Sequence, residues 1–168
     1  MTFNSNENAV VNLRTSELLT DARNVQILGL LRDDPRMNIS ELARRVGMSA
    51  PAIRERIQRL EEAKVILGYR LEIDPRALGY SVGVFVRIRP APGKLPKIIE
   101  LAQHVPEVTE CHRITGEDCF ILRIYLQSLD ELDRILDQFL AYGQTTTSLV
   151  QSSPVPPRGL PLPGERRR

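Results

Sequence analysis

The stretch that most constrains this chain is ELARRVGMSAPAIRERIQRL, residues 41–60. It predicts two short helices joined at Gly47, because glycine readily takes the left-handed conformation that ends a helix. Asn38, three residues before a glutamate, predicts the start of the first helix as a capping box. Ser49 is a suitable N-cap for the second helix, and Pro51 is tolerated only in a first turn. Two helices joined in this way can place one of them in a DNA groove.

The second of these helices has two different faces. Ile53, Ile57 and Leu60 recur at i, i+4 and i+7, which predicts a buried stripe. The opposite side carries small residues near its start and arginines further along, which can approach a groove floor and reach phosphates or guanine edges. A third helix, beginning at Thr20 or Asp21, would pack against the pair. The predicted DNA-contacting residues are Ser49, Ala50, Pro51, Ala52, Arg54, Glu55, Arg56 and Arg59.

A helix pair of this kind has a second interpretation. Such pairs also occur in all-α cores, and arginines on an exposed helix face are often simply solvated. Arg56 stands where a frequent helix–turn–helix template has an apolar residue, and Ile57 takes that role instead. We interpret the pattern as a reader of double-stranded DNA.

The net charge of +2 is unevenly distributed. Residues 20–66 hold nine Lys/Arg against seven Asp/Glu, residues 67–151 hold nine against eleven, and residues 152–168 hold four against one. Because the basic excess of the helical region is small, we expect DNA affinity to come from pairing copies of this domain on one duplex.

Composition disfavours several other classes of protein. No stretch reaches the ~18 apolar residues of a membrane span and the start MTFNSN lacks a signal-peptide layout, so we expect a cytoplasmic protein without a membrane partner. The two cysteines show no CxxC spacing, so no metal, cofactor or disulfide is expected. Cys111 and His112 are adjacent in a predicted strand and point to opposite faces, so they cannot form a nucleophile–base pair. We therefore expect no enzyme activity.

From residue 80 onward, alternation replaces the helical period. Apolar residues stand at the even positions from Tyr80 to Ile88, which predicts a strand with one covered face. A helix, a hairpin about residues 116–118, a second helix and a last strand follow. Ser128 and Glu131 form the capping box of that second helix. The order strand, helix, strand, strand, helix, strand is the ferredoxin-like βαββαβ arrangement, a four-stranded sheet with both helices on one face.

The open face of such a sheet needs a partner. Phe85, Tyr125 and the threonines of the last strand would lie there, so we expect a homodimer through stacked sheets.

In the hairpin, we expect Cys111 to pair with a residue near position 123 or 124, so that Cys119 does not face Cys111. In the second helix of this domain, five side chains are expected to point into the core: Leu129, Leu132, Leu136, Phe139 and Leu140.

Several motifs occur in a fixed order along the chain: LTDARN at 19–24, ELARRVG at 41–47, RERIQRLE at 54–61, VILGY at 65–69, ECH at 110–112 and TGE at 115–117. With the predicted architecture, they resemble the Lrp/AsnC family, the feast/famine transcriptional regulators of bacteria and archaea. The resemblance covers roughly residues 18–151. It implies a sequence-specific DNA-binding regulator that dimerises through its C-terminal sheets, often assembles into octamers, and responds to an amino acid or related metabolite.

In many members of that family, a Gly-Asp-aromatic-Asp loop after the second strand lies at the effector site. Here the loop reads Gly116-Glu117-Asp118-Cys119. A free amino acid needs acceptors for its ammonium and donors for its carboxylate, which this loop and the polar residues 144–147 can offer. The expected effector-binding residues are Thr115, Gly116, Glu117, Asp118, Cys119, Gln144, Thr145, Thr146 and Thr147. Alternatively, these are an ordinary hairpin turn and good strand residues.

The predicted fold class is α+β: a three-helix, winged-type helix–turn–helix domain joined by a short hinge to a ferredoxin-like ligand-binding domain. The tail holds five of the twelve prolines and ends in three arginines, so we expect it to be mobile and polyproline-like. The predicted organisation is 1–17 disordered or an arm, 18–66 the DNA-binding domain, 67–79 the hinge, 80–151 the effector-binding and oligomerisation domain, and 152–168 a Pro-rich basic tail.

Two alternative functions fit the second domain, an RNA-binding module and a stand-alone metabolite sensor. RNA-recognition modules with this topology stack bases on paired aromatic residues of the sheet. Phe85, Phe120 and Tyr125 could serve, but the chain has only eight Phe, Tyr and Trp residues and lacks an Arg-Gly-Phe signature. The DNA-binding interpretation is therefore preferred.

Overall fold

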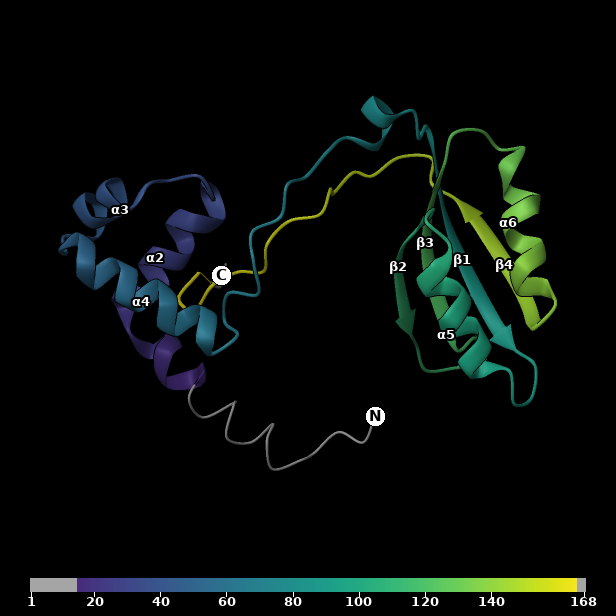
Figure 1. The fold of residues 1–168 in the computed structure, drawn as a ribbon, viewed down its shortest axis with the longest axis horizontal. Helices are drawn as coiled ribbons and strands as arrows, with labels where there is room; N and C mark the ends of the chain where they lie inside the picture. Colours follow the sequence, from purple (N-terminus) through teal and green to yellow (C-terminus); the bar gives the residue numbers. More distant parts are fainter. Residues whose placement is uncertain (1–14, 166–168) are drawn as a thin grey trace. The chain divides into compact units, whose positions relative to one another are not determined.

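The computed structural model describes residues 15–165, which divide into two compact units (Figure 1). Of the described residues, 15–71 and 157–165 form one unit, and Glu72–Pro156 forms the other. Within the described residues, no helix is long and apolar enough to cross a membrane.

The first unit is built from three helices: α2 (Ala22–Asp33), α3 (Ile39–Val46) and α4 (Ala50–Glu62). The predicted N-caps are confirmed. The Asp21 carboxylate accepts from the Arg23 N–H at 2.8 Å, the Asn38 side chain from the Glu41 N–H at 2.9 Å, and the Ser49 hydroxyl from the α4 backbone. These bonds satisfy helix N–H groups that have no partner within their own helix.

Two details of this unit differ from expectation. The Asn38 box is not reciprocal, because the Glu41 carboxylate binds the guanidinium groups of Arg44 and Arg45 instead of reaching back to the cap. The described chain is also helical from residue 15 to residue 20, before the expected start of the domain at residue 18. The remainder of the expected arm, residues 1–14, lies outside the described residues.

The glycine at the helix–helix turn has the predicted conformation. Gly47 takes φ 71°, and its N–H and that of Met48 both bind the Ala43 carbonyl at 2.9 Å, which closes the end of α3. The three helices enclose one apolar core, made of Ile27, Leu31, Leu42, Ala43, Val46 and Ile53.

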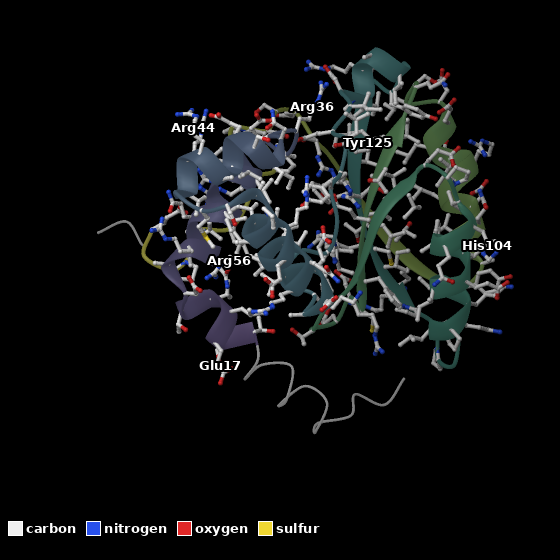
Figure 2. All side chains as sticks on the ribbon, turned by 60° about the vertical axis from the view of Figure 1, so that its left-hand side comes forward. Glu17, Arg36, Arg44, Arg56, His104 and Tyr125 are labelled. Atoms are coloured by element: carbon white, nitrogen blue, oxygen red, sulfur yellow. The ribbon has the colours of Figure 1, made fainter. Side chains whose placement is uncertain are left out.

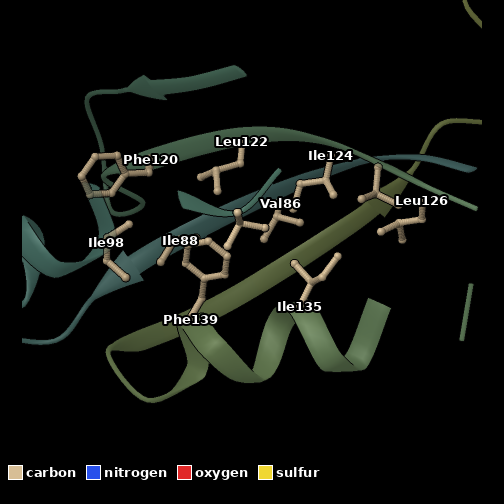
Figure 3. Packing of buried hydrophobic residues seen from close by; sticks show 11 residues of the cluster. Val86, Ile88, Ile98, Phe120, Leu122, Ile124, Leu126, Ile135 and Phe139 are labelled. Carbon is tan, nitrogen blue, oxygen red and sulfur yellow. The ribbon is translucent and has the colours of Figure 1, made fainter. Parts of the chain in front are cut away.

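The second unit has the predicted βαββαβ order. It consists of β1 (Val82–Pro90), α5 (Leu95–His104), β2 (Val108–Arg113), β3 (Phe120–Leu126), α6 (Glu131–Leu140) and β4 (Gly143–Leu149). All strand pairs are antiparallel, in the spatial order β2-β3-β1-β4. Both helices cover one face of the sheet, and the core lies between them and alternate strand residues (Figure 3).

Several expectations for this unit need correction. Cys111 pairs with Leu122, one step from the expected register, although both cysteines are free as expected. Ser128 does not cap α6 through its hydroxyl, since the chain enters that helix at Asp130 without a side-chain cap. Leu129 and Leu140 are about half exposed, because the buried stripe of α6 centres on Ile135 and Phe139 instead.

The chain between residues 67 and 81 holds no strand; its one regular element is the 3₁₀ turn η1 (Pro75–Leu78), ended by Gly79 at φ 88°. The Pro-rich tail also differs from expectation. Its segment from Pro157 belongs to the first unit, where Glu165 pairs with Arg32 of α2.

Candidate DNA-reading and effector sites

Helix α4 is held from one side and open on the other. Ile53 and Leu60 are fully buried, and Ile57 packs against the same core. Away from this core, Ser49, Pro51 and Arg54 are exposed and Ala52 is partly exposed, whereas Ala50 packs partly against the core. A helix start lined by small side chains can approach base edges closely, since no bulky group separates the backbone from the groove floor.

The predicted DNA-contacting arginines lie in three different environments. Arg54 is exposed and makes no ion pair within residues 15–165. The Arg59 guanidinium pairs with the Glu55 carboxylate one turn before it, so a phosphate at Arg59 would have to compete with that acid. Of the three predicted arginines, only Arg54 carries a positive charge that no carboxylate of the described chain neutralises, because Arg56 is also paired, with Asp21.

Arg56 does not lie on the open face of α4, where the predicted DNA contact would place it. Its Nη1 donates to the Asp21 carboxylate at 2.5 Å and to the Asn24 side-chain oxygen at 2.8 Å, between α2 and α4 (Figure 2). The Arg56 bond, followed by the Arg23 backbone N–H, lowers the pKa of Asp21. The sequence signal was the departure from the template, because a polar residue at an inward position must find a partner there.

Helix α3 brings further basic groups to the same unit. Arg44 and Arg45 share the Glu41 carboxylate, and their hydrogen bonds lower the pKa of Glu41 to about 2. Arg44 keeps 72% of its side chain exposed and projects from the unit (Figure 2). Side chains of α2 bind the end of α3: Arg23 donates to the Val46 carbonyl and Gln26 to the Arg45 carbonyl. The first helix of the pair is thus fixed against α2.

The open face of the sheet carries a charged cluster at the hairpin end. Arg87 and Arg89 of β1 lie 3.9 Å from the Asp118 carboxylate, and Arg89 also pairs with Glu117. The Cys119 N–H donates to the Ile88 carbonyl at 3.0 Å, which holds the loop against β1. The sequence-based prediction assigned no role to these arginines; their alternation with valine and isoleucine was the available signal.

Strand β4 divides the predicted effector residues between two faces. Gln144 and Thr146 lie opposite Arg89 and Arg87 on the open face. Thr145 and Thr147 lie opposite Ile88 and Val86, which are buried beneath the helices, so they point to the other face. Cys119 also packs against that core. The structure therefore brings Glu117, Asp118, Gln144 and Thr146 together, and it separates Cys119, Thr145 and Thr147 from them.

The middle of the open face holds an aromatic cluster. The Arg123 guanidinium lies 5.8 Å from the ring centre of Phe85 and 5.1 Å from that of Tyr125, and it pairs with Glu110 of β2 at 3.3 Å. Phe120 is only 1% exposed on the helix-covered face. This position removes Phe120 from the aromatic set that an RNA-recognition module would need.

Within residues 15–165, no group of three or more His, Cys, Asp or Glu side chains could hold a metal ion. Both units match known family descriptions. Residues 20–66 match a winged helix–turn–helix DNA-binding domain, and residues 83–160 match an Lrp/AsnC ligand-binding domain.

Whole-chain relatives agree with these domain matches. The chain is 30% identical over 132 residues to the HTH-type transcriptional regulator LrpC of Bacillus subtilis, covering 79% of this chain and 92% of that protein. It is 33% identical over 136 residues to the HTH-type transcriptional regulator LrpA of Mycobacterium tuberculosis, covering 79% and 88%.

Solved structures show the same fold. The structure of B. subtilis LrpC matches with a TM-score of 0.75 and 29% identity, over 79% of this chain and 95% of that one. A feast or famine regulatory protein of M. tuberculosis, complexed with L-methionine, matches with a TM-score of 0.77 and 28% identity, over 83% and 97%. The chain belongs to the Lrp/AsnC family, whose members are DNA-binding transcriptional regulators with a helix–turn–helix domain, not enzymes.

Proposed function

We propose that this regulator reads double-stranded DNA with the exposed face of α4. The observation that carries the proposal is the contrast between the two sides of that helix, Ile53 and Leu60 fully buried and Arg54 exposed without an ion pair in the described chain. The residues assigned to the duplex are Ser49, Ala50, Pro51, Ala52, Arg54, Glu55 and Arg59. Arg56 is assigned the role of holding α4 against α2.

The DNA test uses a duplex selected from a random library by the full-length protein. Arg54→Ala should weaken binding by about 1–3 kcal/mol and relax the preference at one base pair if Arg54 reads a base. A loss that is uniform across sequences, with a salt slope reduced by about one, would identify a phosphate contact. Arg36→Ala, which removes an exposed arginine outside α4, is the charge-matched control. Unchanged binding by both Arg54→Ala and Arg59→Ala would exclude this face.

The open sheet face supports a homodimer formed by stacked sheets. Phe85 stands on this face with 37% of its surface exposed, and the aromatic cluster around Arg123 lies at its centre. A second copy would bury these side chains, and the isologous contact would place two reading helices on one particle. Dimers would then associate further, with an octamer as the expected assembly. Sedimentation velocity over a range of concentrations measures both steps.

The effector is proposed to be a free amino acid, bound in the cytoplasm at the charged cluster. Arg87 and Arg89 offer donors for its carboxylate, and Glu117 and Asp118 offer acceptors for its ammonium. The side chains of Gln144 and Thr146 and the Gly116 backbone complete the set. L-methionine in the related M. tuberculosis structure supports this ligand class. Because Arg87, Arg89 and Glu117 remain about half or more exposed, a second copy is needed to enclose the ligand.

Isothermal titration against a panel of amino acids, beginning with L-methionine and L-leucine, tests the effector site. Arg89→Ala should reduce affinity about tenfold or more, because a charge-assisted hydrogen bond to the carboxylate is lost. Lys97→Ala, on α5 at the opposite face of the sheet, should bind as the unmodified protein does. Equal affinity of the Arg89→Ala and Lys97→Ala variants would place the effector elsewhere.

A further inference from the structure

The C-terminal tail contains a turn that its sequence encodes. The Glu165 N–H donates to the Leu162 carbonyl at 3.0 Å, with Pro163 and Gly164 at the two central positions and Gly164 at φ 90°. Proline presets the first central position of such a β-turn, and glycine accepts the positive φ of the second. This part of the tail therefore has a defined conformation.

The turn directs the carboxylate of Glu165 onto helix α2. Two parallel hydrogen bonds join it to the Arg32 guanidinium, at 2.6 Å from Nη1 and 2.9 Å from Nη2. The same carboxylate accepts the Leu162 N–H at 2.9 Å. These bonds, that of Arg32 first, lower the pKa of Glu165 to about 2. A two-point arginine–carboxylate pair fixes orientation as well as distance, so the segment meets α2 in one arrangement.

Two further contacts show that the tail and the helix fit closely. A Leu162 methyl carbon lies 3.7 Å from the place where Gly29 would carry a Cβ. A Cβ at Gly159 would come within 2.9 Å of the Arg32 side-chain stem. Gly29 and Arg32 are three residues apart on one face of α2, and on that helix the buried residues Ile27 and Leu31 point the other way. The tail thus lies on the outer face of α2, with glycine at both close approaches.

We propose that this outer face of α2 is a docking surface for residues 159–165 of the same chain, and that docking restrains the DNA-reading unit. The chain leaves this unit after Leu71 and returns to it at Pro157, so the docked tail makes a second connection to the ligand-binding unit. None of the residues assigned to the duplex belongs to α2, so the docked tail leaves them to the DNA.

A second connection limits the orientations that each reading unit can take. In a dimer, this lowers the entropy lost when two reading helices settle on one duplex, because part of that freedom has already been removed. The restraint depends on the paired reading proposed above, whereas the docking itself does not. Docking should therefore increase the affinity for DNA that carries two half-sites.

Hydrogen exchange in the full-length protein tests the docking. The amides of Leu162 and Glu165 should exchange roughly tenfold or more slowly than in an unstructured chain, because both are hydrogen-bonded. Glu165→Arg and Arg32→Glu should each abolish this protection. The double variant reverses the pair and should restore protection at residue 165, whose N–H binds the Leu162 carbonyl, but not at Leu162, whose acceptor is the lost carboxylate. Free-chain exchange in the unmodified protein, or failure of the double variant to regain protection at residue 165, would overturn the docking.

Fluorescence anisotropy with the selected duplex tests the restraint. Glu165→Arg should weaken binding roughly three- to tenfold despite its added positive charge, and the double variant should recover it. A chain ended after Glu165 loses three arginines but keeps the turn, so it controls for tail charge. Undiminished affinity in a variant whose tail has lost protection would overturn the restraint. Whether α4 contacts DNA is decided separately, by the DNA affinity of the Arg54→Ala variant.

Discussion

The guanidinium of Arg56 donates to the carboxylate of Asp21 at 2.5 Å and so joins α4 to the residue that caps α2. Asp21 serves both helices, since it also accepts the N–H of Arg23. A residue whose type suggests DNA contact therefore has a positioning role. The angle between α2 and α4, and with it the presentation of Arg54, depends on this pair.

Replacing Arg56 with methionine keeps an aliphatic stem and removes the charge. The free energy of unfolding should fall by about 1–2 kcal/mol, because two hydrogen bonds are lost at a site that is only partly exposed. Urea denaturation measures this change. Arg54→Met, two positions earlier and exposed, should alter it by less than about 0.5 kcal/mol. Equal losses from both substitutions would contradict the distinction between them.

Within residues 15–165, one non-glycine residue has a left-handed backbone conformation. This is Lys64, at φ 58°, just after the α4 C-cap. The Val65 N–H binds the Leu60 carbonyl at 2.9 Å across it, which fixes this helix end. Lys64→Gly should raise the free energy of unfolding by about 1 kcal/mol, since glycine carries no Cβ to clash there. Lys64→Ala keeps the Cβ and should give no such gain. A destabilised Lys64→Gly variant would refute this expectation.

Gly143 begins β4 where the sheet leaves no space for a side chain. A Cβ at this position would lie 2.4 Å from the Arg89 carbonyl oxygen and 2.9 Å from the Pro90 Cα. Gly143→Ala should lower the free energy of unfolding by about 1–3 kcal/mol, because backbone must move to admit the methyl group. It should also weaken effector binding, since Gln144 would shift from Arg89.

Gly83 offers a matched control on β1. Its added Cβ would meet the Tyr125 ring at 3.5 Å, an ordinary contact distance. Thermal unfolding and titration of Gly83→Ala and Gly143→Ala should therefore differ clearly. Similar behaviour of the two variants would show that β4 can move away from β1 without cost.

Low pH should reduce the stability of the folded protein around α3, because the Glu41 carboxylate becomes protonated. Arg44 and Arg45 lower the pKa of Glu41 from 4.5 to about 2 in the folded protein. The folded state therefore binds this proton less readily than the unfolded chain, so the stabilisation is complete above pH 4.5 and is lost as the pH falls toward 2. Melting temperatures over this range should fall less steeply for Glu41→Gln than for the unmodified protein.

The double variant Arg44→Gln/Arg45→Gln offers a reciprocal test of the same cause. Removing both guanidinium groups removes what lowers the Glu41 pKa, so the acid dependence should flatten as it does in Glu41→Gln. If only the carboxylate substitution had this effect, the arginines would not be its origin.

Local patterns predicted most of the fold. The caps at Asp21, Asn38 and Ser49 depend on side chains that bind backbone within three residues, so the sequence identifies them without knowledge of distant contacts. The alternation along β1 likewise predicts which face is buried, because successive strand residues point to opposite sides. Ser128 shows the limit of such patterns: its spacing to Glu131 suits a cap, yet the chain enters α6 at Asp130.

The candidate sites were predicted less completely than the fold. The prediction named the loop at 116–118 and the polar strand at 144–147, but it did not include Arg87 and Arg89, which lie between them. Cross-strand register decides which threonines share a face with these arginines, and register depends on pairing between segments far apart in the chain.

By itself, the sequence determined the two units, the order of their elements and the small-residue face of α4, because each follows from periodicity and capping over a few neighbouring residues. The family followed from the resemblance that the ordered motifs carry. Only the tertiary structure decided that Arg56 joins Asp21, that Thr145 and Thr147 turn from the charged cluster, and that Glu165 returns to Arg32. These pairs bring together residues up to 133 positions apart. Which residues pair in this way depends on the packing of the whole chain, and local sequence patterns do not predict it.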